Sequence, residues 1–101
     1  MASHYDALII GTGQAGPYLA GRFTAAGMTV AIAERRLFGG TCVNTGCIPT
    51  KTLVASAHAV HAVRRAAEFG VDVPGAPTVD MKRVKARKDD ISGHSRDGLE
   101  S

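Results

Sequence analysis

A glycine-rich turn near the N-terminus restricts the fold of this chain more than any other feature. The turn has the spacing G-x-G-x-x-G over Gly11–Gly16 and follows the segment His4–Ile10, which ends in an unbroken apolar run. Such a run is typical of a strand buried on both faces of a parallel sheet. A helical pattern over Gln14–Ala26 and a second strand pattern over Met28–Ala33 follow. This order predicts an α/β fold, a partial Rossmann-like unit of a doubly wound parallel sheet (β-α-β followed by helices).

Each glycine of the turn has a distinct physical use. Gly11 permits the tight turn, Gly13 lets a pyrophosphate approach the backbone, and Gly16 lets helix and strand pack closely. Glu34 ends the second strand, where a carboxylate can accept hydrogen bonds from ribose hydroxyls. The pattern predicts a dinucleotide site, with a ligand-free glycine connection as the alternative. Arg35 and Arg36 could instead indicate a site for the 2′-phosphate of NADP, but the acidic Glu34 beside them argues against that interpretation.

The rest of the chain has mainly helical patterning. One segment is rich in alanine, with its larger apolar residues along one face. Beyond Ser92 the residues are small or charged, which predicts a frayed end. The predicted elements are a loop over Arg35–Thr41, a helix over Pro49–Phe69, a turn over Gly70–Pro77, and a last helix from Thr78 or Asp80 toward Asp90.

Composition and charge exclude several classes of protein. The net charge is +3 and 45% of the residues are hydrophobic. The basic residues of segment 82–88 are flanked by aspartates and lack aromatic neighbours, which favours a solvated helix face over a nucleic-acid patch. The apolar runs are far shorter than the ~18–20 residues of a membrane span, and the first residues do not resemble a secretion signal. We therefore expect a cytoplasmic protein without nucleic-acid or membrane partners.

The cysteines Cys42 and Cys47 are five residues apart. In an ideal α-helix that spacing separates the Cα atoms by ~8.6 Å, whereas a disulfide needs less than about 7 Å. The pair can therefore bridge only where the turn between them is distorted, and Gly46 gives the backbone that freedom. A redox dithiol at a helix N-terminus is one interpretation. A structural disulfide and a zinc site with His58 and His61 are the alternatives.

The segment Gly39–Lys51, with the sequence GGTCVNTGCIPTK, resembles the redox-active segment of the class I pyridine nucleotide–disulphide oxidoreductases. That family includes dihydrolipoamide dehydrogenase, glutathione reductase and mercuric reductase. The glycine turn and Glu34 lie at the matching distance upstream. The resemblance implies that the dinucleotide is FAD and that NAD(P)H is the co-substrate. Electrons would pass from NAD(P)H through FAD and a Cys42–Cys47 disulfide to a small-molecule substrate.

The resemblance also implies roles for individual residues. Cys42 matches the interchange thiol that reacts with substrate, and Cys47 matches the thiol beside the flavin. Lys51 matches a lysine near the flavin, where a cation stabilises negative charge on the reduced ring. Thr41 matches a position that contacts the cofactor. No resident metal is implied.

The substrate is predicted from finer features of the same segment. The stretch Cys47–Ala57 looks most like mercuric reductases and their relatives, which implies Hg(II) as substrate. Thr50 stands where glutathione reductases commonly have lysine. The alternatives are dihydrolipoamide dehydrogenase or another disulfide reductase of the family, and a truncated dinucleotide-binding fragment without activity.

Family members are much longer than this chain and act as enzymes. We therefore expect residues 1–101 to be the N-terminal part of an FAD/NAD(P)-binding domain, incomplete and inactive when isolated. The NAD(P) and dimerisation domains would be absent from it. The full-length protein would be a homodimer.

Overall fold

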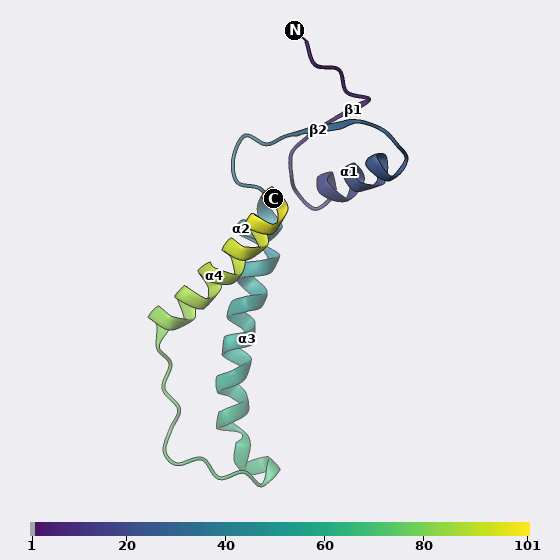
Figure 1. Cartoon of the computed structure of the whole chain (residues 1–101). Coiled ribbons are helices and arrows are strands. Elements are labelled where there is room, and N and C mark those ends of the chain that lie inside the picture. Colours follow the sequence, from purple (N-terminus) through teal and green to yellow (C-terminus); the bar gives the residue numbers. More distant parts are fainter. Residues whose placement is uncertain (1) are drawn as a thin grey trace.

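The computed structural model describes residues 2–101. Its first part is a β–α–β unit formed by β1 (Ala7–Ile10), α1 (Gly16–Ala25) and β2 (Val30–Ala33) (Figure 1). The two strands pair in parallel over their full length. Parallel neighbours need a crossover connection, and α1 provides it. The predicted α/β unit of Rossmann-like type is thereby confirmed.

The second part is helical and consists of α2 (Gly40–Asn44), α3 (Cys47–Arg64), the 3-10 helix η1 (Ala66–Phe69) and α4 (Met81–Glu100). α3 leads away from the strands, and α4 returns along it so that the C-terminus lies beside α2 (Figure 1). The molecule measures 68 × 26 × 17 Å with a radius of gyration of 20.3 Å, against about 13 Å for a compact chain of this length. Among the described helices, none is long and apolar enough to cross a membrane.

Both strands are shorter than the predicted segments His4–Ile10 and Met28–Ala33. The Asp6 carboxylate accepts hydrogen bonds from the N–H and the hydroxyl of Thr29, over 2.8 and 2.9 Å. These bonds hold the pKa of Asp6 below its ordinary 3.8. The backbone N–H groups of Asp6 and Ala7 also donate to the Thr29 carbonyl oxygen, over 3.0 and 3.1 Å, and the regular strand pairing begins with Ala7 and Val30, the residues that follow this pair.

The helix boundaries also differ from the predictions. α1 begins at Gly16, inside the predicted Gln14–Ala26, because the glycine turn occupies the residues before it. The predicted loop Arg35–Thr41 ends early, since its last residues form the first turn of α2. α3 begins two residues before the predicted Pro49–Phe69, which places the proline in the first turn, where a missing N–H costs little. The last residues of that segment form η1 instead.

α4 is longer than predicted. Its N-terminus is capped by Asp80, whose carboxylate accepts the N–H groups of the second and third helical residues over 3.0 and 3.2 Å. Of the two residues predicted to begin this helix, Thr78 and Asp80, the structure has Asp80 as the cap. The expected fraying beyond Ser92 is wrong. The helix continues to Glu100 and packs on α2 and α3, with Ser92 buried against them. Tertiary contact therefore supplies the order that local composition does not.

The most buried residues lie where the glycine turn meets the helices. Val43 on α2 is 4% exposed, and Pro49 at the start of α3 is also buried. Thr12, Thr52 and Ser92 are buried polar residues from the turn, α3 and α4. The core is thus a small junction between the two parts of the chain.

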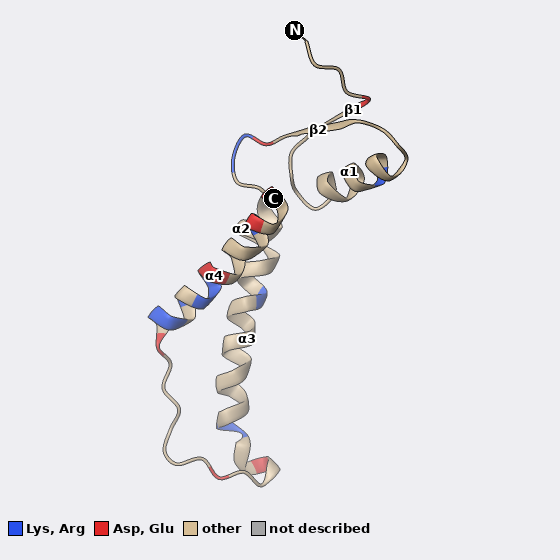
Figure 2. Ribbon diagram, in the orientation of Figure 1, with Lys and Arg blue, Asp and Glu red and all other residues tan. Residues whose placement is uncertain are grey.

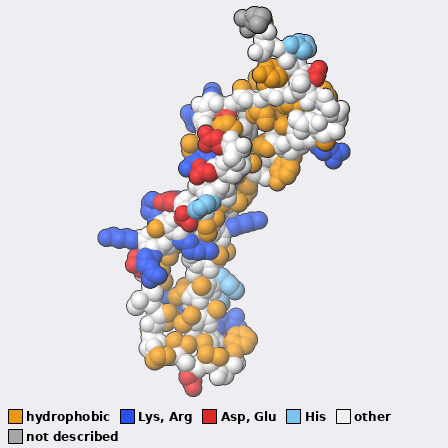
Figure 3. All heavy atoms as spheres, viewed as in Figure 1, with side chains coloured by type: hydrophobic (Ala, Val, Ile, Leu, Met, Phe, Trp, Pro, Cys, Tyr) orange, Lys and Arg blue, Asp and Glu red, His pale blue; other side chains and the backbone are white. Residues whose placement is uncertain are grey.

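The expected burial of β1 on both faces is wrong. Leu8 is 67% and Ile10 85% exposed, because α1 packs on one face of the sheet and the other face is open. The apolar face predicted for α3 is also partly open, with Leu53 and Val63 exposed. Figure 3 shows hydrophobic side chains on the surface where the far end of α3, η1 and the following segment meet. Little apolar area is therefore removed from water outside the junction.

Candidate functional site

The glycine turn has the backbone geometry that its spacing predicts. Gly11 has a φ of +99°, a conformation that L side chains rarely adopt. A Cβ on Gly16 would lie 2.5 Å from the Gly11 carbonyl oxygen, so the helix approaches the turn too closely for any side chain. A Cβ on Gly13 would meet no atom within 4 Å. The turn is therefore closed toward the sheet and open at its middle glycine.

Glu34 follows the last residue of β2 and bonds back to the turn. One carboxylate oxygen accepts the Thr12 hydroxyl over 2.7 Å and the Thr12 N–H over 3.0 Å, and the other accepts the Arg36 N–H over 3.0 Å. These bonds, with the Thr12 hydroxyl as the largest cause, lower the pKa of Glu34 from 4.5 to about 2. Glu34 is therefore an oriented, ionised acceptor over the whole physiological pH range.

A cavity of about 300 Å³ opens at the carboxyl ends of the two strands. Its walls are formed by the last residues of the strands, by the start of the glycine turn and by Glu34. Ligands of open parallel sheets bind at this edge. Its lining residues are Ile10, Gly11, Ala33, Glu34 and Arg35.

The glycine turn lies in direct contact with the start of α2. The Gly39 N–H donates to the carbonyl oxygen of Thr12 over 3.0 Å and to its hydroxyl over 3.2 Å. A Cβ on Gly40 would lie 2.9 Å from the Cα of Gly13, so the two backbones touch where only glycine fits. The fold thus brings together two motifs that are well separated in the sequence.

The cysteines form a disulfide within the helical segment that follows. Cys42 lies on α2 and is partly buried, and Cys47 is the first residue of α3 and is exposed. Their Cα atoms are 4.6 Å apart, closer than an unbroken helix allows, because the helix is interrupted between Asn44 and Cys47. A Cβ on Gly46 would lie 2.9 Å from the Thr41 carbonyl oxygen. The distortion predicted at Gly46 is the one that the structure shows.

The remaining predicted residues flank the disulfide. Thr41 is exposed on α2, and its carbonyl oxygen accepts the Thr45 N–H over 2.9 Å. Lys51 is exposed on α3, one helical turn after Cys47. Neither side chain is held by a hydrogen bond in the part of the chain that the structure describes. Their roles toward a cofactor stay predictions.

Two residues that the motifs do not single out brace the disulfide segment. The Asn44 side-chain amide donates to the carbonyl oxygens of Phe38 and Gly40, over 2.9 and 3.0 Å. Its own carbonyl oxygen accepts from Arg96 of α4 over 3.4 Å. The position of Asn44 between the two cysteines is a sequence signal that could have pointed to its role. No sequence pattern pointed to Arg96, which is 52 positions away.

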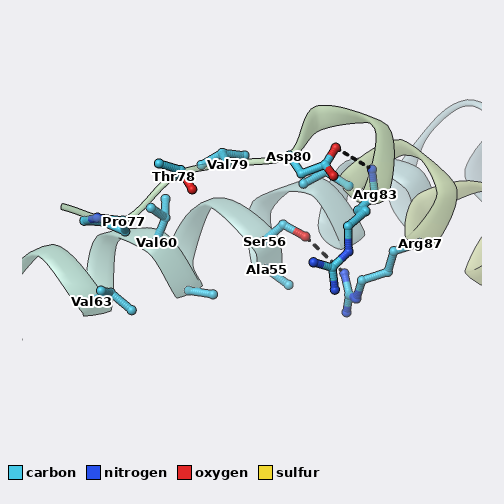
Figure 4. Close-up of a pocket in the computed structure, with 12 residues that line it drawn as sticks. Ala55, Ser56, Val60, Val63, Pro77, Thr78, Val79, Asp80, Arg83 and Arg87 are labelled. Carbon is cyan, nitrogen blue, oxygen red and sulfur yellow. Dashed lines mark hydrogen bonds between the residues drawn. The ribbon is translucent and has the colours of Figure 1, made fainter. Parts of the chain in front are cut away.

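A larger cavity, of about 600 Å³, lies between α3 and the start of α4 (Figure 4). Its walls are mostly apolar, and Arg87 crosses from α4 to donate to the Thr52 carbonyl oxygen and the Ser56 hydroxyl, over 3.1 and 3.3 Å. The predicted site residues do not line it. We therefore assign it to helix packing and not to the candidate site.

The charged residues of α4 are largely engaged within the chain. Figure 2 shows both signs of charge interleaved along this helix. Asp89 pairs with Lys85 and with Lys88, which lowers the pKa of its carboxyl below 3.8. These pairs agree with a helix face whose charges balance locally.

The two histidines on α3 do not join the cysteines in one cluster. The rings of His58 and His61 are 6.5 Å apart. Over residues 2–101, no group of three or more histidine, cysteine, aspartate or glutamate side chains is placed to hold a metal ion. Cys42 and Cys47 are joined to each other in this structure.

Comparison with known proteins gives a consistent result over nearly the whole chain. The family model described as pyridine nucleotide-disulphide oxidoreductase matches residues 5–98. A dihydrolipoyl dehydrogenase of Chlamydia muridarum is 40% identical over 99 residues, which is 98% of this chain and 21% of that protein. A dihydrolipoyl dehydrogenase of Bacillus subtilis is 39% identical over 88 residues, 87% of this chain and 18% of that protein.

A solved structure is similar in fold as well as in sequence. It is a Cu(II) complex of a mutant of the HOCl-induced flavoprotein disulfide reductase RclA from Escherichia coli. The identity is 34% and the TM-score 0.73, over 97% of this chain and 19% of that one. The chain thus spans about a fifth of the length of the relatives that it matches.

Proposed function

The chain belongs to the pyridine nucleotide–disulphide oxidoreductase family, and from this we propose that it is the FAD-binding N-terminal segment of a longer flavoprotein disulfide reductase. The observation that carries the proposal is the backbone contact between the glycine turn and α2. It sets a disulfide beside a turn suited to a dinucleotide. The segment 1–101 would then be part of one FAD/NAD(P)-binding domain, and NAD(P)H would be the co-substrate of the full-length protein.

The residues of the turn fit the adenosine and pyrophosphate parts of FAD. The open face of Gly13 leaves room for a phosphate against the backbone, next to the positive end of α1. The cavity at the strand ends is lined by Glu34, whose ionised carboxylate would accept ribose hydroxyls. Gly11 and Gly16 would shape the turn. FAD, when bound, supplies the two-electron chemistry that links NAD(P)H to the disulfide.

The disulfide segment would carry the exchange chemistry. A substrate thiolate attacks the sulfur of Cys42, a mixed disulfide forms, and Cys47 leaves as a thiolate that keeps the bonding electron pair. The position of Cys47 at the first residue of an 18-residue helix favours that thiolate. A second substrate thiol then displaces Cys42, so the substrate is oxidised to a disulfide and the protein holds two reduced sulfurs. The reverse sequence reduces a disulfide substrate.

Thr41 and Lys51 would act on a cofactor bound beside this segment. Both are exposed next to the cysteines, on α2 and on the first turns of α3. Lys51 lies one helical turn after Cys47 on α3 and would bring a positive charge near that cysteine. We assign both residues to cofactor binding as part of the proposal.

For the substrate, dihydrolipoamide is better supported than Hg(II). The relatives reported above are dihydrolipoyl dehydrogenases at 39–40% identity, whereas the preference for Hg(II) rests on the resemblance of Cys47–Ala57 alone. Hg(II) reduction and homodimer formation by a full-length protein stay predictions. Each is a property of a chain several times longer than the one described here.

Binding of FAD to the purified chain tests the cofactor. We expect FAD to be retained on ultrafiltration, with a change in flavin fluorescence, and riboflavin to be lost because it lacks the pyrophosphate and adenosine. Glu34→Gln should weaken FAD retention, and Glu100→Gln, an exposed change at the end of α4, should not. Equal retention of FAD and riboflavin, or of neither, would contradict the proposed site.

Dithiol exchange tests the substrate class. The oxidised chain is mixed with dihydrolipoamide or with reduced glutathione, and the reduced cysteines are alkylated and counted by mass spectrometry. We expect dihydrolipoamide to reduce the disulfide faster, because its second thiol completes the exchange within one molecule. Equal rates would count against a dihydrolipoamide specificity, and a parallel incubation with Hg(II) measures metal bound by the reduced pair.

A further inference from the structure

Thr12 has the least exposed side chain beside the candidate site, with 1% of its surface accessible. Its hydroxyl donates to a carboxylate oxygen of Glu34 over 2.7 Å, and its oxygen accepts the Gly39 N–H over 3.2 Å. Donation and acceptance at one atom require a hydroxyl side chain. Two consecutive hydrogen bonds therefore connect Gly39 through the Thr12 hydroxyl to Glu34.

The two partners of Thr12 lie at the two ends of one loop. Glu34 begins the segment that joins β2 to α2, and Gly39 ends it directly before α2. Glu34 also holds the middle of the loop, since its second oxygen accepts the Arg36 N–H over 3.0 Å. Cys42 follows within the first turn of α2. The hydroxyl thus restrains the loop that leads to the disulfide.

We propose that Thr12 is a positioning residue that couples the carboxylate of Glu34 to the loop carrying the Cys42–Cys47 disulfide. It orients Glu34 toward the cavity at the strand ends and holds Gly39 where α2 must begin. The significance of Glu34 for a dinucleotide rests on the proposed function. The series of hydrogen bonds does not, because it joins residues of the protein itself.

The backbone supports a clean test of the hydroxyl. The Thr12 N–H still reaches Glu34 over 3.0 Å, and the Thr12 carbonyl oxygen still accepts the Gly39 N–H over 3.0 Å, whatever the side chain. Thr12→Val has nearly the same shape and removes only the hydroxyl. Thr12→Ser keeps it. Thr24→Val is the matched control, because the Thr24 hydroxyl donates to the Gly21 carbonyl oxygen within α1 and to no other residue of segment 2–101.

The first measurements use the chain without ligand. The pKa of Glu34 is followed by carboxyl NMR, and hydrogen exchange is followed at the Gly39 amide. In Thr12→Val we expect the pKa of Glu34 to rise from about 2 toward 4.5 and Gly39 exchange to accelerate. Thr12→Ser should restore both, and Thr24→Val should change neither. An unchanged pKa and unchanged exchange in Thr12→Val would overturn the proposal.

The second measurement separates this proposal from the proposed function. Thr12→Val should weaken FAD binding about tenfold or more, as expected for a hydrogen bond to a charged group, and Thr12→Ser should recover it. If the NMR responses appear but the unsubstituted chain binds no FAD, the coupling stands and the proposed function fails. If Thr12→Val does not fold, Gly39 exchange in Glu34→Gln decides. Faster exchange supports the coupling, and unchanged exchange overturns it.

Discussion

The Cα atoms of Cys42 and Cys47 lie 4.6 Å apart although five positions separate them in the sequence. The short distance arises because α2 ends at Asn44 and a new helix begins at Cys47, with a tight bend between them. Disulfide formation therefore depends on the backbone of the bend as much as on the cysteines. The same bend places the second cysteine at a helix N-terminus, where a thiolate is favoured.

Gly46→Ala should impair disulfide formation. The added Cβ would lie 2.9 Å from the Thr41 carbonyl oxygen and 3.2 Å from the Cys42 Cα, so the backbone of the bend must move. Free thiols after air oxidation, counted with a thiol reagent, should rise relative to the unsubstituted chain. Gly21→Ala on α1 is the control, since its Cβ meets no atom within 4 Å. Full oxidation of Gly46→Ala at the normal rate would contradict this account.

Gly16→Ala and Gly13→Ala should have different effects. A Cβ on Gly16 would lie 2.5 Å from the Gly11 carbonyl oxygen, and the resulting overpacking should cost about 1–3 kcal/mol of unfolding free energy in urea denaturation. A Cβ on Gly13 points into open space, so its effect on stability should stay within about 0.5 kcal/mol. If a phosphate lies there, FAD binding should weaken by about 1.4 kcal/mol, a tenfold change. Equal stability losses in the two variants would be inconsistent with the geometry.

Stability should depend on the ionisation of Glu34 at acid pH. The pKa is about 2 in the folded chain against an ordinary 4.5, so the carboxylate stabilises the fold above pH 4.5 and this contribution disappears as pH falls through about 2. Urea unfolding of Glu34→Gln and of the unsubstituted chain should differ most above pH 4.5 and converge toward pH 2. Asp6 and Asp89 also have lowered pKa values, but both titrate alike in the two proteins. A constant difference across this range would refute the assignment.

Asn44→Asp should loosen the disulfide segment. The substitution replaces the amide donor by a carboxylate oxygen that faces the Phe38 and Gly40 carbonyl oxygens, so both bonds are lost. We expect a loss of about 1–3 kcal/mol in unfolding free energy at neutral pH. Arg96→Met removes the 3.4 Å contact to Asn44 and an exposed 4.0 Å ion pair with Asp97, and should cost less. The ranking is checked by urea denaturation, and a larger effect of Arg96→Met would reverse the assigned importance.

The local motifs could be predicted from the sequence because their physical requirements involve only a few adjacent residues. A positive φ at Gly11 and a close approach at Gly16 follow from the spacing of a single turn, and both are present. The parallel strand pair followed from the same pattern. Asp80 was one of the two residues predicted to begin the last helix, and it caps α4 because its carboxylate reaches the N–H groups of the next helical turn. The roles of Thr41 and Lys51 came from resemblance and stay to be tested.

The burial of side chains and the order at the end of α4 could not be predicted from the sequence in the same way. The apolar residues of β1 predicted a strand covered on both faces, yet Leu8 and Ile10 are exposed because α1 covers only one side. The polar end of α4 predicted fraying, yet it is helical because α2 and α3 lie against it. In both cases the outcome depends on which element is the neighbour, and periodicity within one element carries no information about its neighbour.

The sequence by itself determined the family, the glycine turn, the cysteine pair and the acidic residue after the second strand. Each of these is specified by residue types at short spacing, since turns, caps and helix starts depend on a few adjacent residues. Only the tertiary structure decided that Gly39 and Glu34 share the Thr12 hydroxyl, and that Arg96 reaches Asn44 across 52 positions. Such contacts join residues that are distant in the chain. They exist only once the glycine turn, the loop and α4 have packed together.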